Sequence, residues 1–172
     1  MALRGREEPE GLVDGQPQAD PSEVAREIAL RLLSVRARSQ AELEDAMRRR
    51  GVPEGAMRQV IDRFSELGLV DDRAFSKMWV EGQQRRMRSA RALRHELREK
   101  GISNEVIDEA LDSVGGEEEY SAALALARKR AYATRTLPVE VRRRRILGAL
   151  ARRGFPSGIA YRAVDEALTE VD

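Results

Sequence analysis

The chain has 172 residues, of which 41% are hydrophobic and 35% are charged, so its core must lie beneath a densely charged surface. Aromatic residues make up only 4%, and Ala, Leu, Arg and Glu outnumber β-branched residues, which favours helices over strands. The absence of cysteine excludes a disulfide framework and a thiolate metal site. No apolar run approaches the roughly 20 residues that span a bilayer, and the first residues lack the apolar stretch of a signal peptide. We therefore expect a cytoplasmic protein without membrane contact.

The first segment in chain order, residues 1–20, contains several Gly and Pro residues, shows no apolar periodicity and is net acidic. We predict that it forms a disordered tail. Helical order is expected from Asp20-Pro21-Ser22-Glu23, which offers an N-cap, a proline at the first helical position and a glutamate at the capping-box position. The net charge of +1 therefore conceals a modestly basic remainder, in which nearly all the positive charge is Arg.

After this tail the sequence repeats a helix–glycine–helix pattern three times. Each copy has apolar residues eight and four positions before a glycine and another directly after it: Leu43, Met47, Gly51 and Val52; Leu93, Leu97, Gly101 and Ile102; Ile146, Leu150, Gly154 and Phe155. The residues before each glycine are mostly basic, as expected of a helix that ends on a left-handed glycine. Pro53, Ser103 or Pro156 then starts the following helix.

A further helix precedes each of these pairs. Its apolar residues recur at helical spacing in all three copies: Ile28, Leu32 and Leu33; Phe75, Met78 and Trp79; Ala123, Leu124 and Ala127. Start signals such as the capping box at Ser39, the N-cap at Asp71 and Ser89 at the start of the fifth helix support these divisions. The predicted fold is all-α, with nine helices in three tandem three-helix repeats at residues 21–70, 71–115 and 116–172, stacked on one another.

No residue pattern points to catalysis. The only histidine, His95, lies on a charged helix and is expected to be exposed to solvent. The phosphate-loop, dinucleotide and nucleophile-elbow motifs are absent from the sequence. Asp71-Asp72 and Glu117-Glu118-Glu119 are best explained as helix starts. We therefore expect no enzyme activity, no metal and no other cofactor.

Arginine clusters are the strongest binding signal. In the second repeat Arg91, Arg94 and Arg98 form a stripe at i, i+3 and i+7. One cluster alone is best explained as a solvated face balanced by glutamates. Clusters on two successive repeats favour an acidic partner surface or a phosphate backbone. The candidate contact residues are Arg85, Arg86, Arg88, Arg91, Arg94, Arg98, Arg142, Arg145, Arg152 and Arg153.

Two further expectations concern side-chain direction. Arg145 and Arg152 should share a solvent face, opposite an apolar face that is made of Val139, Ile146 and Leu150. Arg143 falls inside that apolar face, which snorkelling or a shifted helix axis would explain. In the second repeat Trp79, four residues after Phe75, is predicted to be a core residue rather than a platform for stacked bases.

Parts of the second and third repeats resemble a known family. Residues 66–80, Glu-Leu-Gly-Leu-Val-Asp-Asp-Arg-Ala-Phe-Ser-Lys-Met-Trp-Val, look like the Asp-Asp-x-x-Phe-x-x-x-Trp-Val signature of RecX, the regulatory protein of the RecA recombinase. Residues 93–102, Leu-Arg-His-Glu-Leu-Arg-Glu-Lys-Gly-Ile, look like its Glu-Leu-x-x-Lys-Gly-Ile signature, and residues 150–155 resemble its Arg-Arg-Gly-Phe turn. The likeness extends over about residues 22–172.

The resemblance implies an elongated, curved array that lies in the helical groove of the RecA filament. Such a protein limits filament extension or favours disassembly, lowers ATP hydrolysis and strand exchange, and has no active site. The expected partners are the RecA filament and, secondarily, single-stranded DNA, which a monomer would contact through several repeats. The family signatures look mainly structural, so the arginines above are candidates by their placement alone.

Two other functions remain open. A helix–glycine–helix unit can be a helix-turn-helix, so the chain could be a DNA-binding transcriptional regulator. Residues 107–112 and 163–168 are acidic on the open side of their helices, however, which leaves the helix with Arg58, Gln59 and Arg63 as the only acceptable base reader. A scaffold that binds partner helices without meeting nucleic acid is the third possibility.

Overall fold

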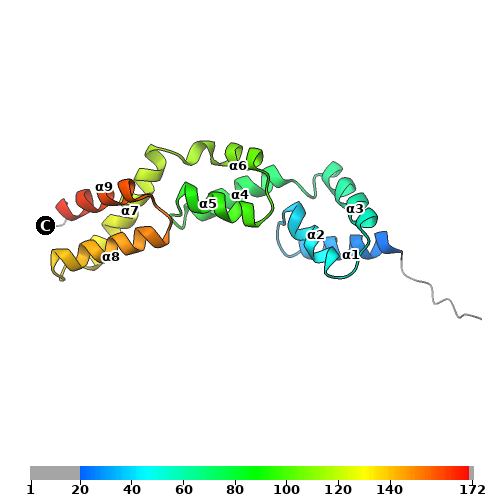
Figure 1. Cartoon of the computed structure of the whole chain (residues 1–172), viewed down its shortest axis with the longest axis horizontal. Coiled ribbons are helices and arrows are strands. Elements are labelled where there is room, and N and C mark those ends of the chain that lie inside the picture. Colours follow the sequence, from blue (N-terminus) through cyan, green and yellow to red (C-terminus); the bar gives the residue numbers. More distant parts are fainter. Residues whose placement is uncertain (1–19, 171–172) are drawn as a thin grey trace, which may run out of the picture.

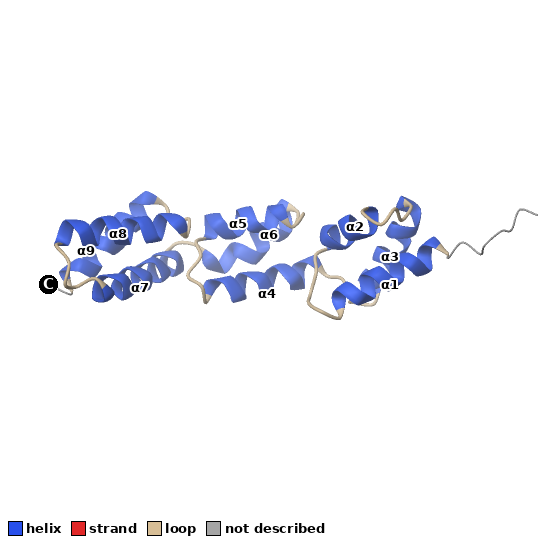
Figure 2. Ribbon diagram, turned by 90° about the horizontal axis from the view of Figure 1, so that it is seen from below, coloured by secondary structure: helices blue, strands red, loops and turns tan. Residues whose placement is uncertain are grey.

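The computed structural model describes residues 20–170, so the predicted tail lies, apart from Asp20, outside the described residues. Within this range the chain forms nine α-helices, one short 3-10 turn and no strand. The elements are α1 Pro21–Leu33, α2 Gln40–Arg48, α3 Glu54–Glu66, α4 Asp72–Gln84, α5 Ala90–Glu99, α6 Asn104–Leu111, η1 Asp112–Val114, α7 Glu117–Ala133, α8 Val139–Arg152 and α9 Ser157–Thr169. Figures 1 and 2 show an elongated, arched array of three groups, which we name unit 1 (α1–α3), unit 2 (α4–α6 with η1) and unit 3 (α7–α9). The expected all-α array is confirmed.

Each unit encloses its own small core. The apolar residues that precede the glycines are fully buried, as predicted: Leu43, Met47, Leu93, Leu97, Ile146 and Leu150 are 0% exposed. Three separate buried clusters result, one in each unit. Burying one such side chain contributes about 1.5–3 kcal/mol, so a single unit gathers a limited core stabilisation. Contacts between neighbouring units therefore matter for the stability of the array.

The glycine turns have the conformation that the sequence predicts. Gly51, Gly101 and Gly154 have φ of 74°, 75° and 86°, in the left-handed region that favours glycine. In each turn the amide after the glycine donates back to the helix, as Ile102 N does to the Leu97 carbonyl at 3.1 Å. The apolar side chain at this position is buried in all three units, and it thereby fixes the direction of the next helix.

The joint between units 1 and 2 is formed by the glycine turn of unit 2 and the start of α2. The Ser39 hydroxyl caps α2 and also donates to the Lys100 carbonyl at 2.7 Å. A β-carbon on Gly101 would come within 2.3 Å of the Ala41 β-carbon. Gly101 therefore has two functions, since it permits the left-handed turn and lets this turn approach α2 closely.

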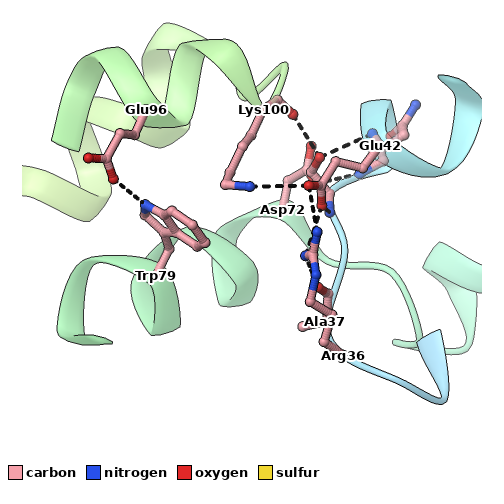
Figure 3. A network of polar contacts seen from close by, with 9 residues as sticks. Arg36, Ala37, Glu42, Asp72, Trp79, Glu96 and Lys100 are labelled. Carbon is pink, nitrogen blue, oxygen red and sulfur yellow. Dashed lines mark hydrogen bonds and ion pairs between the residues drawn. The ribbon is translucent and has the colours of Figure 1, made fainter. Parts of the chain in front are cut away.

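A polar network surrounds this first joint (Figure 3). Glu42 accepts hydrogen bonds from Arg36 at 2.9 Å and from the Lys100 ammonium at 3.1 Å. Partial burial alone would raise the pKa of Glu42, but these bonds outweigh it and lower the pKa from 4.5 to about 2. Asp72 of α4 accepts from the first helical amide of α2, that of Gln40, at 2.9 Å, and burial raises the pKa of this carboxyl. Both carboxylates thus link the two units.

The joint between units 2 and 3 repeats this arrangement. The Ser89 amide at the start of α5 donates to the Arg153 carbonyl at 3.1 Å. A β-carbon on Gly154 would lie 2.7 Å from the Ser89 hydroxyl oxygen. The first helical amide of α5, that of Ala90, donates to Glu119 of α7 at 3.0 Å. At both joints the following unit therefore supplies a glycine turn and a carboxylate to one helix N-terminus.

Gly101→Ala and Gly51→Ala form a matched pair that separates backbone strain from packing at the joint. Both variants place alanine at a positive φ, which costs roughly 1–2 kcal/mol. A β-carbon added at Gly51 would meet no atom within 4 Å, whereas one added at Gly101 would collide with Ala41. We expect Gly101→Ala to lower the free energy of unfolding by about 1–3 kcal/mol more than Gly51→Ala in urea unfolding followed by circular dichroism. Equal losses would contradict a packing function for Gly101.

Glu42→Gln tests the polar network through its pH dependence. Because the pKa of Glu42 lies below its ordinary value in the folded chain, the ionised carboxylate stabilises the fold above pH 4.5 and loses this effect as the pH falls towards about 2. The difference in free energy of unfolding between the native chain and Glu42→Gln should therefore shrink by roughly 2–3 kcal/mol between neutral pH and about pH 2. Glu54→Gln is the control, because the Glu54 side chain is 81% exposed. A pH-independent difference for Glu42→Gln would contradict a stabilising effect of the ionised Glu42 carboxylate.

Candidate functional site

The predicted arginine stripe on α5 lies at the surface, but two of its members hold the unit together. Arg94 pairs with Asp108, and Arg98 donates to the Asn104 side chain at 3.0 Å, so both connect α5 to α6. Arg91 is exposed and, within residues 20–170, forms no ion pair. Of the stripe, Arg91 alone therefore keeps its guanidinium available for another molecule.

The arginines before α5 divide in the same way. Arg85 and Arg86 are exposed, and no carboxylate of the described residues pairs with them. Arg88 is half-buried and donates to Glu96 at 2.8 Å and to the Arg152 carbonyl at 3.4 Å. Arg88 thus connects the loop before α5 to unit 3, while Arg85 and Arg86 are exposed to solvent.

In α8 the prediction was wrong for Val139 and Arg142, although Ile146 and Leu150 are buried as predicted. Arg142 is 3% exposed and shares the buried face with Ile146, whereas Val139 is 43% exposed. Arg143 lies half-exposed beside the core and pairs with Asp165 of α9. The buried positions follow the i, i+4 spacing from Arg142 rather than from Val139, and the first turn of α8 extends past the core. Arg142 is therefore removed from the candidate contact surface.

The remaining arginines of unit 3 have different surroundings. Arg145 and Arg152 are exposed, as the sequence predicts. Arg153 is half-buried, and its guanidinium donates to the Arg86 carbonyl across the joint between units 2 and 3. No contact places Arg145 beside this joint, so the expected cluster is smaller than the sequence suggests.

The second joint brings three predicted arginines around one cavity. This open cavity of about 520 Å³ is lined by Trp79, Gln83, Arg86, Arg88, Glu96 and Arg153. Glu96 is its only carboxylate and already accepts from Arg88. Guanidinium groups bind phosphate and carboxylate oxygens in two-point geometry. The cavity with its exposed neighbours Arg85 and Arg152, which we name the joint-2 surface, is thus suited to an anionic partner.

Trp79 is a joint residue more than a core residue. It is partly buried against the unit 2 cluster, as predicted in part, and its indole N–H donates to Glu96 at 3.1 Å (Figure 3). The Lys100 ammonium lies 4.1 Å from the centre of the ring, and the Phe75 ring stacks on it with centroids 6.1 Å apart. These contacts connect the indole to the first joint through Lys100, which does not favour the ring as a free platform for bases.

Sequence reasoning missed the joints themselves. It assigned Ser39, Asp72, Ser89 and Glu119 to helix caps and first turns within one unit, whereas each also contacts the neighbouring unit. A signal was present, because a serine stands at the same spacing before the glycine in the first two repeats. The third repeat has Arg142 at that position.

Other kinds of site receive no support from the described residues. Within residues 20–170 no group of three or more His, Cys, Asp or Glu side chains is arranged to hold a metal ion. His95 is exposed on α5, and its Nε2 lies 3.5 Å from a carboxylate oxygen of Glu99. None of the helices in this range is both long and apolar enough to cross a membrane.

Comparison with known proteins identifies all three units. The models of the first, second and third three-helix domains of RecX match residues 25–64, 71–111 and 117–164. The regulatory protein RecX of Thermobifida fusca is 44% identical over 161 residues, which cover 90% of this chain and 87% of the relative. The regulatory protein RecX of Streptomyces lividans is 43% identical over 157 residues, covering 91% and 84%.

Solved structures show the same architecture. The crystal structure of RecX from Lactobacillus salivarius superposes with a TM-score of 0.74 at 22% identity, covering 87% of this chain and 98% of that one. A second crystal structure, of a regulatory protein RecX, gives a TM-score of 0.70 at 25% identity and covers 86% and 73%. With three matched domains and relatives of this identity along almost their whole length, the chain belongs to the RecX family of regulatory proteins.

Proposed function

We propose that this chain is a negative modulator of the RecA recombinase, which binds in the groove of the RecA–DNA filament and limits its extension, ATP hydrolysis and strand exchange. The membership of a family of regulatory proteins supports the regulatory part. The elongated array supports binding in the filament groove, because successive units of a repeat protein can contact successive subunits of a polymer. Such contacts strengthen one another when the units are held at a fixed spacing.

The joint-2 surface is the observation that carries this proposal. Arg86, Arg88 and Arg153 surround one cavity, and only Glu96 balances them there. Exposed arginines without an ion pair retain their charge for a partner, whereas exposed pairs contribute little. We assign the contact with the filament, and a secondary contact with single-stranded DNA, to this surface and the adjacent Arg91. Binding to bare DNA should then be weak and salt-sensitive, and the chain should act as a monomer.

The ion pairs argue against the helix-turn-helix alternative. Asp108 pairs with Arg94 and Asp165 with Arg143, so the exposed sides of α6 and α9 are acidic and engaged. In α3, Arg58 and Arg63 pair with glutamates of the same helix. No helix after a glycine turn therefore presents a row of free donors for base edges.

The decisive experiment is a titration of this chain onto preformed RecA filaments, with single-strand-dependent ATP hydrolysis as the readout. Inhibition well below one chain per RecA protomer, together with weak and salt-sensitive binding to bare DNA, is the expected result. An unchanged rate of hydrolysis with tight binding to one particular duplex would point to the helix-turn-helix alternative. An unchanged rate without DNA binding would leave a scaffold that binds partner helices.

A triple substitution, Arg85→Gln, Arg86→Gln and Arg152→Gln, tests the joint-2 surface. The three side chains are exposed, and the joint uses only the main-chain carbonyls of Arg86 and Arg152, so the fold should persist. We expect the concentration for half-inhibition of RecA to rise by about 10-fold, which corresponds to roughly 1.4 kcal/mol of binding free energy.

The matched control removes the same charge from unit 1, as Arg26→Gln, Arg58→Gln and Arg63→Gln, whose native side chains pair with glutamates of their own helices. Circular dichroism checks the helicity of both variants. An equal loss of inhibition in the two triple variants would reduce the effect to net charge and would remove the joint-2 surface from the contact.

A further inference from the structure

Unit 1 has a groove between α1 and α2 that none of the contacts above uses. It encloses about 360 Å³ and is lined by Ile28, Arg31, Leu32, Ala46, Arg49 and Arg50. Its floor is apolar, since Ile28 is buried and Leu32 and Ala46 are half-buried. Its rim is basic, and within the described part of the chain the side chains of Arg31, Arg49 and Arg50 form no ion pair or hydrogen bond.

The corresponding positions of unit 2 show what this groove lacks. Counted from the glycine of each unit, Ala29 and Ala46 stand where unit 2 has Trp79 and Glu96. In unit 2 these two side chains provide an aromatic ring and a carboxylate, which bond to each other at 3.1 Å. Unit 1 keeps a basic residue, Arg50, at the position of Lys100, but has no ring or carboxylate to meet it. An occupant with apolar side chains and carboxylates would provide apolar contact in place of the ring and a carboxylate for the basic residue.

We propose that this groove binds residues 7–14 of the same chain, Glu-Glu-Pro-Glu-Gly-Leu-Val-Asp. This segment carries four carboxylates and no basic residue, and it includes Leu12 and Val13. Leu12 and Val13 would cover the apolar floor, while the carboxylates would lie beside the three guanidiniums of the rim. The opposite charges and the apolar pair match the groove in kind, and both the ion pairs and the apolar contact favour binding.

The length of the chain permits this contact. From Asp20 to Leu32 at the groove, α1 rises by roughly 18 Å, at about 1.5 Å per residue. An extended chain from Val13 to Asp20 spans roughly 23 Å, at about 3.3 Å per residue. Such a short tether gives the segment an effective concentration in the mM range. A groove of modest affinity would therefore be occupied in the intact chain.

Disulfide trapping in the full chain tests the proposal cleanly, because the native sequence has no cysteine. The groove variant combines Val13→Cys with Ala46→Cys on the floor of the groove. The control variant combines Val13→Cys with Leu30→Cys. Leu30 is 44% exposed, lies at the same level of α1 as the groove residues, and is on the side of the helix away from the groove. Oxidation by glutathione disulfide is followed on non-reducing gels, with circular dichroism as the check on folding.

The expected result is an intramolecular disulfide that forms about 10-fold faster in the groove variant than in the control variant, as a bound segment requires and random collision of a tether does not. Adding Glu7→Lys, Glu8→Lys and Glu10→Lys should abolish this advantage. Equal rates for the two variants would overturn the proposal, and disulfide-linked dimers alone would assign the groove to a second copy.

Should Ala46→Cys impair folding, a nitroxide attached to Val13→Cys alone tests the same contact. Amide signals of Ala46 and Arg50 are then expected to broaden in NMR spectra, and unchanged signals would overturn the proposal.

Discussion

The array depends on the approach of one glycine turn to the start of a helix in the preceding unit. At the first joint the turn at Gly101 seats against Ala41, and the Ser39 hydroxyl donates to the adjoining Lys100 carbonyl. The hydroxyl of this serine thus accepts from an amide of its own helix and donates to a carbonyl of the next unit. Because interiors are close-packed, an approach at this distance leaves no room for even one methyl group on the turn. A local conformational requirement of glycine thereby becomes a constraint on how whole units stack.

The same joint has two electrostatic versions in one molecule. At the first joint Glu42 pairs with both Arg36 and Lys100, while Asp72 of the neighbouring unit accepts from the Gln40 amide, so two carboxylates are present with two cations. At the second joint Glu119 occupies the place of Asp72, but several arginines surround the turn at Gly154. Equivalent backbone geometry therefore supports a neutral contact in one place and a cationic surface in the other. This difference is why the second joint, and not the first, is the candidate site for an anionic partner.

The fold was predictable because its signals are local. The glycine after each basic helix end, the capping serines and the apolar spacing all act within one or two turns of helix, and the structure confirms them. Arg142 and Val139 are positions that such local signals do not predict. The apolar spacing of α8 fits two helical phases, and only the packing of α7 and α9 against it selects the one that buries Arg142. Likewise, the pairing of Arg94 with Asp108 joins residues of two helices, which periodicity along one helix does not report.

The candidate site lies where two units meet, so its geometry depends on the joint as much as on the arginines. Arg88 reaches the Arg152 carbonyl, and Arg153 reaches the Arg86 carbonyl, so each side of the cavity is held by the other. An arginine that is already fixed loses less side-chain entropy on binding than one that is free in solvent. On the proposed function, a polymer presents its contacts at a fixed repeat, and a partner with loosely connected units would lose freedom at every contact that it makes. Closely seated glycine turns reduce that loss, which connects the packing of Gly101 and Gly154 to binding without any contact between these glycines and the partner.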